Sequence, residues 1–95
     1  SEGAARDGLA VWVAQGCGSC HTFAPAGSRG PIGPDLELTL YGKDRAYIER
    51  GIVAPDAEAP PQYSSFGMPD DYATRIAPAD LTKLVDFIAQ EVGAQ

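Results

Sequence analysis

Length, composition and charge place this chain among small one-domain proteins and exclude several classes. Its 95 residues, 44% of them hydrophobic, predict a single domain over residues 1–95 with one core. No apolar run approaches the about 18 residues of a membrane span, and the N-terminal residues lack the basic and apolar regions of a secretory signal. The net charge of -6, with scattered basic residues, argues against nucleic acid and favours a protein partner with a basic docking surface.

The first predicted helix covers residues 4–15. Its apolar residues at helical spacing are Leu9, Trp12 and Val13. Gly16 directly follows and suits a helix end, because glycine tolerates the left-handed backbone conformation that often occurs there. The next stretch, residues 17–34, is dense in Gly, Ser and Pro, and we therefore predict an irregular loop closed by tight turns.

A second, shorter helix is predicted within residues 43–53, where Asp44 suits the N-cap and Pro55 ends the helix. The residues that share its apolar face are Tyr47, Ile48 and Ile52. Residues 54–77 are rich in proline, and we predict a long loop there. Because a loop of this length is unusual in so small a domain, we expect it to serve the function.

The third predicted helix begins at Pro78, which suits the first helical position, and Asp80 is favourable near its positive end. One apolar stripe runs along it, formed by Leu81, Leu84, Val85, Ile88 and Val92. Ala77 is a poor N-cap, so this end depends on Asp80 and on packing. No alternating strand pattern or internal repeat is present, and the prediction is an all-α fold of three to four helices joined by long loops.

The segment 17–21 has the sequence CGSCH, which is the spacing of covalent c-type haem attachment. In such a site Cys17 and Cys20 each add to one vinyl group of the haem, and His21 reaches the iron. The small residues between the cysteines, Gly18 and Ser19, let the backbone lie close to the porphyrin. The motif therefore predicts one haem c, with His21 as a ligand of its iron.

Three other interpretations of the motif stay open. A structural zinc site needs four protein ligands, whereas the chain has two cysteines and one histidine in total. A redox dithiol of the thioredoxin type expects a neighbouring strand-helix-strand pattern, which is absent from the sequence. A disulfide between cysteines this close would stabilise little, because it closes a very short loop.

The second axial ligand of such a haem is predicted to be Met68, the one methionine of the chain. A single histidine excludes two histidine ligands from this chain, and a His/Met pair is common in electron-transfer haems. Met68 lies between Gly67 and Pro69, in a loop rather than on a helical stripe, which argues against the role of a flexible core filler. The alternatives are an iron with an open position, or a lysine ligand supplied by Lys43 or Lys83.

Taken in order, these features resemble the class I c-type cytochrome family, of bacterial type, over about residues 4–92. The resemblance rests on the helix before CGSCH, on Gly33-Pro34-Asp35-Leu36, on the middle helix, on Gly67-Met68-Pro69 and on the last helix. It implies the cytochrome c fold, wrapped around one covalent haem. It also implies a one-electron carrier rather than an enzyme, because His21 and Met68 fill both axial positions of the iron.

The resemblance assigns roles to further residues. The carbonyl of Pro34 would accept a hydrogen bond from the second ring nitrogen of His21 and fix the imidazole, with an ordinary turn proline as the alternative. The first and last helices would cross where Gly8 meets Phe87, with Trp12 packed nearby. The resemblance implies that these last three residues serve the fold rather than the chemistry.

Three functions compete for such a chain. The first is a free carrier between a donor and an acceptor of a respiratory chain. The second is the haem domain of a membrane-anchored oxidase or dehydrogenase subunit. The third is a haem enzyme or gas sensor with labile Met68 ligation. The resemblance implies the periplasm or the outer face of a bacterial membrane. An acidic rim for a partner is hypothesised at Asp56, Glu58, Asp70 and Asp71, with a solvated loop as the alternative. Candidate contacts to the haem propionates are Arg29, Tyr47, Tyr63 and Arg75.

Overall fold

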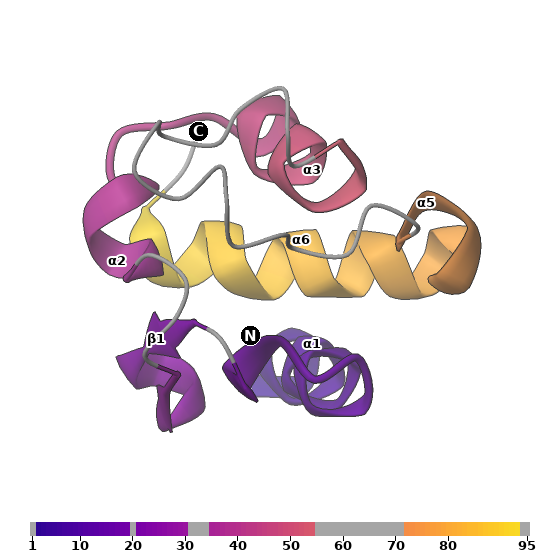
Figure 1. Ribbon diagram of the computed structural model, residues 1–95, viewed down its shortest axis with the longest axis horizontal. Coiled ribbons are helices and arrows are strands. Elements are labelled where there is room, and N and C mark those ends of the chain that lie inside the picture. Colours follow the sequence, from indigo (N-terminus) through magenta and orange to yellow (C-terminus); the bar gives the residue numbers. More distant parts are fainter. Residues whose placement is uncertain (1, 20, 31–34, 55–71, 94–95) are drawn as a thin grey trace.

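The computed structural model describes residues 2–19, 21–30, 35–54 and 72–93, and helices dominate these ranges (Figure 1). The α-helices are α1 (Glu2–Ala14), α2 (Leu36–Thr39), α3 (Arg45–Val53), α5 (Tyr72–Arg75) and α6 (Pro78–Val92). The 3-10 turns η1 (Cys17–Ser19) and η2 (Ala24–Ala26) and the antiparallel strands β1 (Thr22–Phe23) and β2 (Ser28–Arg29) follow α1. The described part is therefore mostly helical, as predicted, with one small sheet.

Helix α6 lies at the centre of the fold, between α3 on one side and α1 on the other (Figure 1). It begins at Pro78 as predicted, and Ala77 at its N-cap makes no side-chain hydrogen bond to the helix. Its predicted stripe faces the core: Leu84, Val85, Ile88 and Val92 are buried, and Leu81 is half-buried. Phe87 and Ala89 are buried as well, so the apolar face of α6 is broader than the sequence pattern predicted.

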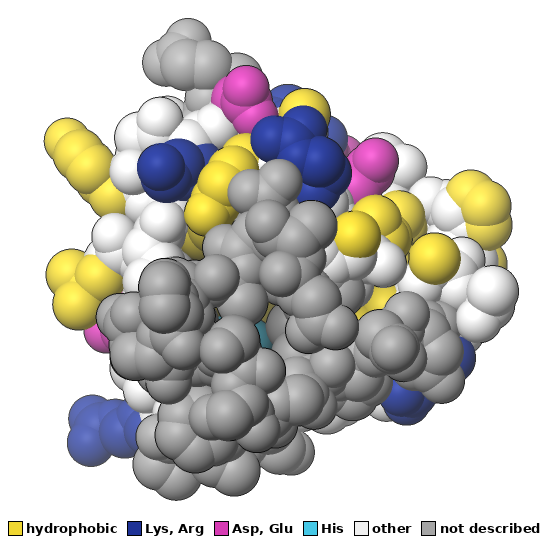
Figure 2. All heavy atoms as spheres, turned by 45° about the horizontal axis from the view of Figure 1, so that its top comes forward, with side chains coloured by type: hydrophobic (Ala, Val, Ile, Leu, Met, Phe, Trp, Pro, Cys, Tyr) yellow, Lys and Arg dark blue, Asp and Glu magenta, His cyan; other side chains and the backbone are white. Residues whose placement is uncertain are grey.

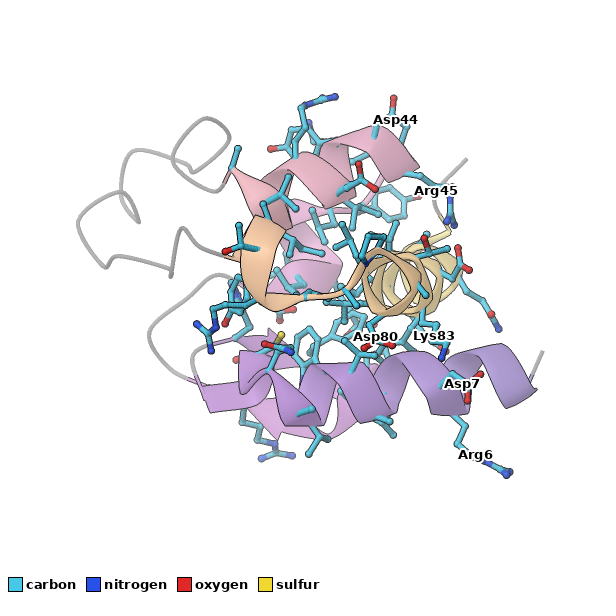
Figure 3. All side chains as sticks on the ribbon, turned by 90° about the vertical axis from the view of Figure 1, so that its right-hand side faces the viewer. Arg6, Asp7, Asp44, Arg45, Asp80 and Lys83 are labelled. Atoms are coloured by element: carbon cyan, nitrogen blue, oxygen red, sulfur yellow. The ribbon has the colours of Figure 1, made fainter. Side chains whose placement is uncertain are left out.

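Helix α1 crosses α6 at a steep angle. Figure 1 shows α6 along its length, and Figure 3 shows α1 along its length with α6 end-on. Gly8 lies at the crossing. A Cβ atom added to Gly8 would overlap Cβ of Phe87 and lie 2.5 Å from the carbonyl oxygen of Lys83. The predicted contact of Gly8 with Phe87 is thus confirmed, and it depends on the missing side chain.

The buried face of α1 differs from the predicted one. Trp12 is buried as expected and Leu9 is half-buried, but Val13 is 70% exposed. Val11 takes its place in the core. The physical reason is that Gly8 sets the line of contact with α6, and Val11 and Trp12 lie three and four residues beyond it on the same face.

Helix α3 begins as predicted. The Asp44 carboxylate accepts a hydrogen bond from the backbone N–H of Tyr47 at 2.8 Å, which is the contact that an N-cap makes. Ile48 and Ile52 are buried against the core, and Tyr47 is half-buried. Arg45, at the start of α3, forms an exposed ion pair with Asp86 of α6 and links the two helices; Figure 3 looks along α6 and shows Arg45 projecting toward it.

Four short elements were not predicted. The strands β1 and β2, of two residues each, pair within the stretch predicted as an irregular loop. Helix α2 covers four residues, and the Asp35 carboxylate caps it by accepting from the N–H of Glu37 at 3.0 Å. Helix α5, also of four residues, lies inside the range 54–77 that was predicted as a loop. Elements this short contain too few residues to show a hydrophobic period.

One hydrophobic core joins the described helices. Its buried members come from α1, β1, α3, α5 and α6 and from the residues just before α6: Val11, Trp12, Phe23, Ile48, Ile52, Tyr72, Ile76, Leu84, Val85, Phe87, Ile88, Ala89 and Val92. On the face shown in Figure 2, exposed hydrophobic side chains form several separate groups, with basic side chains between some of them. Among the helices of the described residues, none has the length and apolar character to cross a membrane.

Candidate functional site

The predicted attachment segment begins where α1 ends. The backbone N–H of Gly16 donates to the carbonyl of Val13 at 3.2 Å, and Gly16 has a φ of 71°. Since this left-handed conformation is costly for residues with a side chain, Gly16 is the residue that lets the chain leave the helix, as the sequence predicted. The chain then enters η1, which starts at Cys17.

Cys17 and His21 belong to one turn. The backbone N–H of His21 donates to the carbonyl oxygen of Cys17 at 3.1 Å. Both side chains are half-buried, and Cys17 packs against the hydrophobic core. The structure thus brings together these two predicted site residues at the edge of the core, whereas Cys20 lies outside the described residues.

A short hairpin follows and holds His21 from its other side. Thr22 pairs with Arg29 and Phe23 with Ser28. The backbone N–H of Gly30 donates to the carbonyl of His21 at 3.1 Å, and the Thr22 hydroxyl donates to the carbonyl of Gly30 at 3.1 Å. The backbone of His21 is therefore fixed by hydrogen bonds at both its N–H and its carbonyl.

Aromatic side chains form the apolar surface next to His21. The Trp12 ring lies 6.5 Å from the His21 ring and 5.2 Å from the Phe23 ring, measured between centroids. Phe23 meets Phe87 edge-on at 5.7 Å. These spacings are those of favourable aromatic pairs, and they connect the candidate site to the crossing of α1 and α6.

Two further predicted site residues, Pro34 and Met68, lie outside the described residues, as do Tyr63 and the four acidic residues of the hypothesised rim. The predicted hydrogen bond from His21 to Pro34 and the predicted iron ligation by Met68 therefore stay predictions. Leu36, which follows the Gly-Pro segment, begins α2 and packs against the core, as does Leu40 just beyond that helix.

The remaining propionate candidates are spread over different elements. Arg29 is exposed at the end of β2. Tyr47 lies on α3, with the Lys43 amine 5.0 Å and the Arg50 guanidinium 6.0 Å from its ring. Arg75 lies over the ring of Tyr72 at 4.9 Å. They occupy three separate elements.

The alternative lysine ligands have other contacts. Lys43 is exposed and lies over the Tyr47 ring, and the Lys83 amine lies 3.8 Å from Asp80 on α6. The Lys83 side chain is half exposed. These contacts are the ordinary ones of solvated lysines, and they favour neither residue as an iron ligand.

Sequence reasoning missed two residues that support the segment. Ser28 accepts a hydrogen bond from the Trp12 indole, and the hydroxyl of buried Tyr72 donates to the carbonyl of Gln15 at 3.2 Å. The second contact joins residues 57 positions apart and ties α5 to the end of α1. A buried tyrosine hydroxyl needs a partner, but no sequence pattern says which carbonyl supplies it.

Part of the donor set of a c-type haem lies in the described ranges. Within those ranges, no group of three or more His, Cys, Asp or Glu residues could hold a metal ion. A c-type haem needs thiols for its vinyl groups and one imidazole next to an apolar surface, and the half-buried Cys17 and His21 beside Trp12 and Phe23 match that need.

Comparison with known proteins adds no family. No family model, no curated protein and no solved structure matches this chain.

Proposed function

We propose that this chain carries one covalently attached haem c and transfers single electrons between protein partners. Cys17 and Cys20 hold the haem through thioether bonds, and His21 and Met68 are the axial ligands of its iron. The polypeptide around it has the cytochrome c fold. The observation that carries the proposal is the turn in which the His21 N–H bonds to the Cys17 carbonyl, at the edge of an aromatic core.

The described residues support such a site in distinct ways. The hydrogen bonds at the N–H and carbonyl of His21 hold its backbone, so the imidazole starts from a fixed position. Buried Trp12 and Phe23 keep water away from one side of it. When bound, the haem iron supplies the ferric/ferrous couple, and a rigid, dry surrounding keeps the rearrangement between the two states small.

Electron transfer is favoured over catalysis because a filled axial pair leaves substrate no position on the iron. The net charge of -6 favours donors and acceptors with a basic docking surface. Covalent haem attachment of this kind places the protein in the periplasm or at the outer face of the bacterial membrane. A tethered haem domain of an oxidase or dehydrogenase would use the same chemistry.

The test is expression together with a c-type haem attachment system, followed by extraction with acidified organic solvent and absorption spectroscopy. The wild-type pigment should stay with the protein, and the ferric form should show the far-red band of sulfur ligation. Cys17→Ser should leave one vinyl group of the haem unreacted, and the absorption bands of the reduced pigment should move to longer wavelength, because that vinyl group stays conjugated with the porphyrin ring. Met68→Ala should remove the far-red band and allow carbon monoxide to bind.

Matched controls are Lys43→Ala and Lys83→Ala, which remove the alternative ligands from exposed positions. Neither should change the spectrum. A colourless wild-type protein, or a pigment that solvent extracts, would contradict the proposal. A spectrum altered by one of the lysine variants and not by Met68→Ala would show that this lysine, and not Met68, is the second ligand.

A further inference from the structure

Trp12 and Ser28 make a hydrogen bond that links α1 to the hairpin. The indole Nε1 of Trp12 donates to the Ser28 hydroxyl oxygen at 2.9 Å, across 16 residues of sequence. Trp12 is 2% exposed and Ser28 is half-buried. A buried indole N–H needs an acceptor, and here the acceptor lies on β2, in the hairpin after the attachment segment.

The bond fixes which way the indole faces. Its Nε1 edge is held by Ser28, and Phe23 packs beside the ring with its centroid 5.2 Å away. Phe23 and Ser28 are paired directly across the hairpin, so both contacts come from one rigid unit. The same indole lies against the His21 ring, at 6.5 Å and with an angle of 51° between the planes. A change in the orientation of the indole would therefore change the space in which the imidazole can rotate.

Gly18 shows how closely the attachment segment fits this bond. A Cβ atom at Gly18 would lie 2.5 Å from the Ser28 hydroxyl oxygen and 3.1 Å from Nε1 of Trp12. Both atoms of the hydrogen bond therefore touch the position between the two cysteines. The groove beside them has a volume of about 380 Å³, and Trp12, Gly18 and Ser28 contribute to its wall.

We propose that Trp12 and Ser28 are positioning residues that set the orientation of the His21 ring relative to Cys17. This inference rests on the proposed function. The orientation matters because the turn must present the Cys17 thiol and the His21 imidazole to the same haem. The indole supplies two things at once: an apolar body for the aromatic core and a donor for Ser28. A phenylalanine at position 12 would supply only the first.

The experiment compares Ser28→Ala in two backgrounds, the wild type and Trp12→Phe. The chain has one histidine, so its ring signals in the NMR spectrum of the reduced protein are assigned without ambiguity. In the wild-type background, Ser28→Ala should shift the His21 ring signals, because it releases the Trp12 indole that lies beside the imidazole. In the Trp12→Phe background, the same substitution should leave them in place, because the donor is already absent.

Unfolding in urea gives the second readout of the same comparison. Loss of one hydrogen bond should raise the unfolding equilibrium constant about fivefold for Ser28→Ala in the wild type, and little in the Trp12→Phe background. The control is Thr82→Ala, which removes a hydroxyl that donates to the Pro78 carbonyl at an exposed site on α6. Thr82→Ala should leave the His21 signals unchanged, and its effect on unfolding should be the same in both backgrounds.

Equal His21 shifts in both backgrounds, or no shift in either, would overturn the proposal; a change in unfolding alone would mean that the bond only stabilises the fold. These outcomes are separate from the fate of the proposed function. If the purified chain proved to carry no pigment, the function would fall, and the same comparisons on that chain would still decide the role of Trp12 and Ser28.

Discussion

The crossing of α1 and α6 and the segment of residues 17–30 are held by different kinds of contact. At the crossing, Gly8 and Phe87 meet without room for another atom, and the surrounding side chains are buried and apolar. In the segment, His21, Thr22 and Gly30 are joined by hydrogen bonds through backbone groups and one hydroxyl. The helices are thus placed by shape, and the candidate site is placed by directional bonds.

The difference matters because the two kinds of contact fail differently. A crossing placed by shape does not accept added volume, since a packed interior cannot make room cheaply. A segment placed by hydrogen bonds can lose one of them and keep its form, at a cost of about 1 kcal/mol. Trp12 belongs to both regions: it packs in the core and donates a hydrogen bond to Ser28, so a shift in one region changes its contacts in the other.

The largest effect is expected when the crossing is broken by Gly8→Ala. The new methyl group would overlap Phe87 and the backbone of Lys83, which cannot move aside as a flexible side chain could. We expect a loss of about 1–3 kcal/mol in the free energy of unfolding, measured in urea. The control is Gly51→Ala on α3, where an added Cβ would meet nothing within 4 Å.

Gly51→Ala should instead stabilise the protein by about 0.5–1 kcal/mol, because alanine is the better helix former. Similar effects from the two alanine substitutions would show that shape does not place the crossing.

A smaller effect is expected when the segment loses a single bond. Thr22→Val keeps the branched shape that suits a strand and removes the donor to the Gly30 carbonyl. The free energy of unfolding should fall by about 0.5–1.5 kcal/mol, and the amide of Gly30, which bonds to His21, should exchange faster with solvent.

The companion variant Thr82→Val removes a comparable hydroxyl bond from the exposed face of α6. Its effect on the unfolding free energy should stay within about 0.5 kcal/mol. If Thr22→Val were as mild as this companion, the hydroxyl would not help to place the segment.

The smallest effect concerns a contact of a third kind, the exposed ion pair between Arg45 and Asp86 that joins α3 to α6. Both side chains are more than 40% exposed, so water and salt weaken their attraction. Arg45→Gln should lower the free energy of unfolding by about 0.2–1 kcal/mol at low salt and by less at high salt.

Arg6→Gln makes the same change of net charge at an exposed position on α1, where Arg6 points away from α6 (Figure 3). It should have no such salt-dependent effect on unfolding. Equal effects of the two variants would assign the loss to net charge rather than to the ion pair.

The fold could be predicted where a pattern spans several turns. The stripe on α6 and the cap at Asp44 identified α6 and α3, and both are confirmed. Val13 was assigned to the wrong face of α1 because hydrophobic periodicity gives no weight to glycine, although Gly8 decides which face is buried. The four-residue helix α2 and the strands of β1 and β2 are too short to leave a pattern.

The candidate site could be predicted in part for a different reason. Cys17 and His21 are four residues apart, so their shared turn could be predicted from the local sequence. The bond from Trp12 to Ser28 and the bond from Tyr72 to Gln15 depend on how distant segments meet. Only the packed structure brings such pairs into contact, and any donor in the sequence could have been assigned to many acceptors.

The pairing of α1 with α6 has a consequence for how the chain is made. A ribosome makes α1 before α6, yet the surface on which Gly8 packs includes Lys83 and Phe87 of α6. Contacts between segments so far apart require the closure of a long stretch of chain, which slows folding relative to proteins built from neighbouring contacts. The pair of α1 and α6 therefore forms only after the stretch of chain between the two helices has been made.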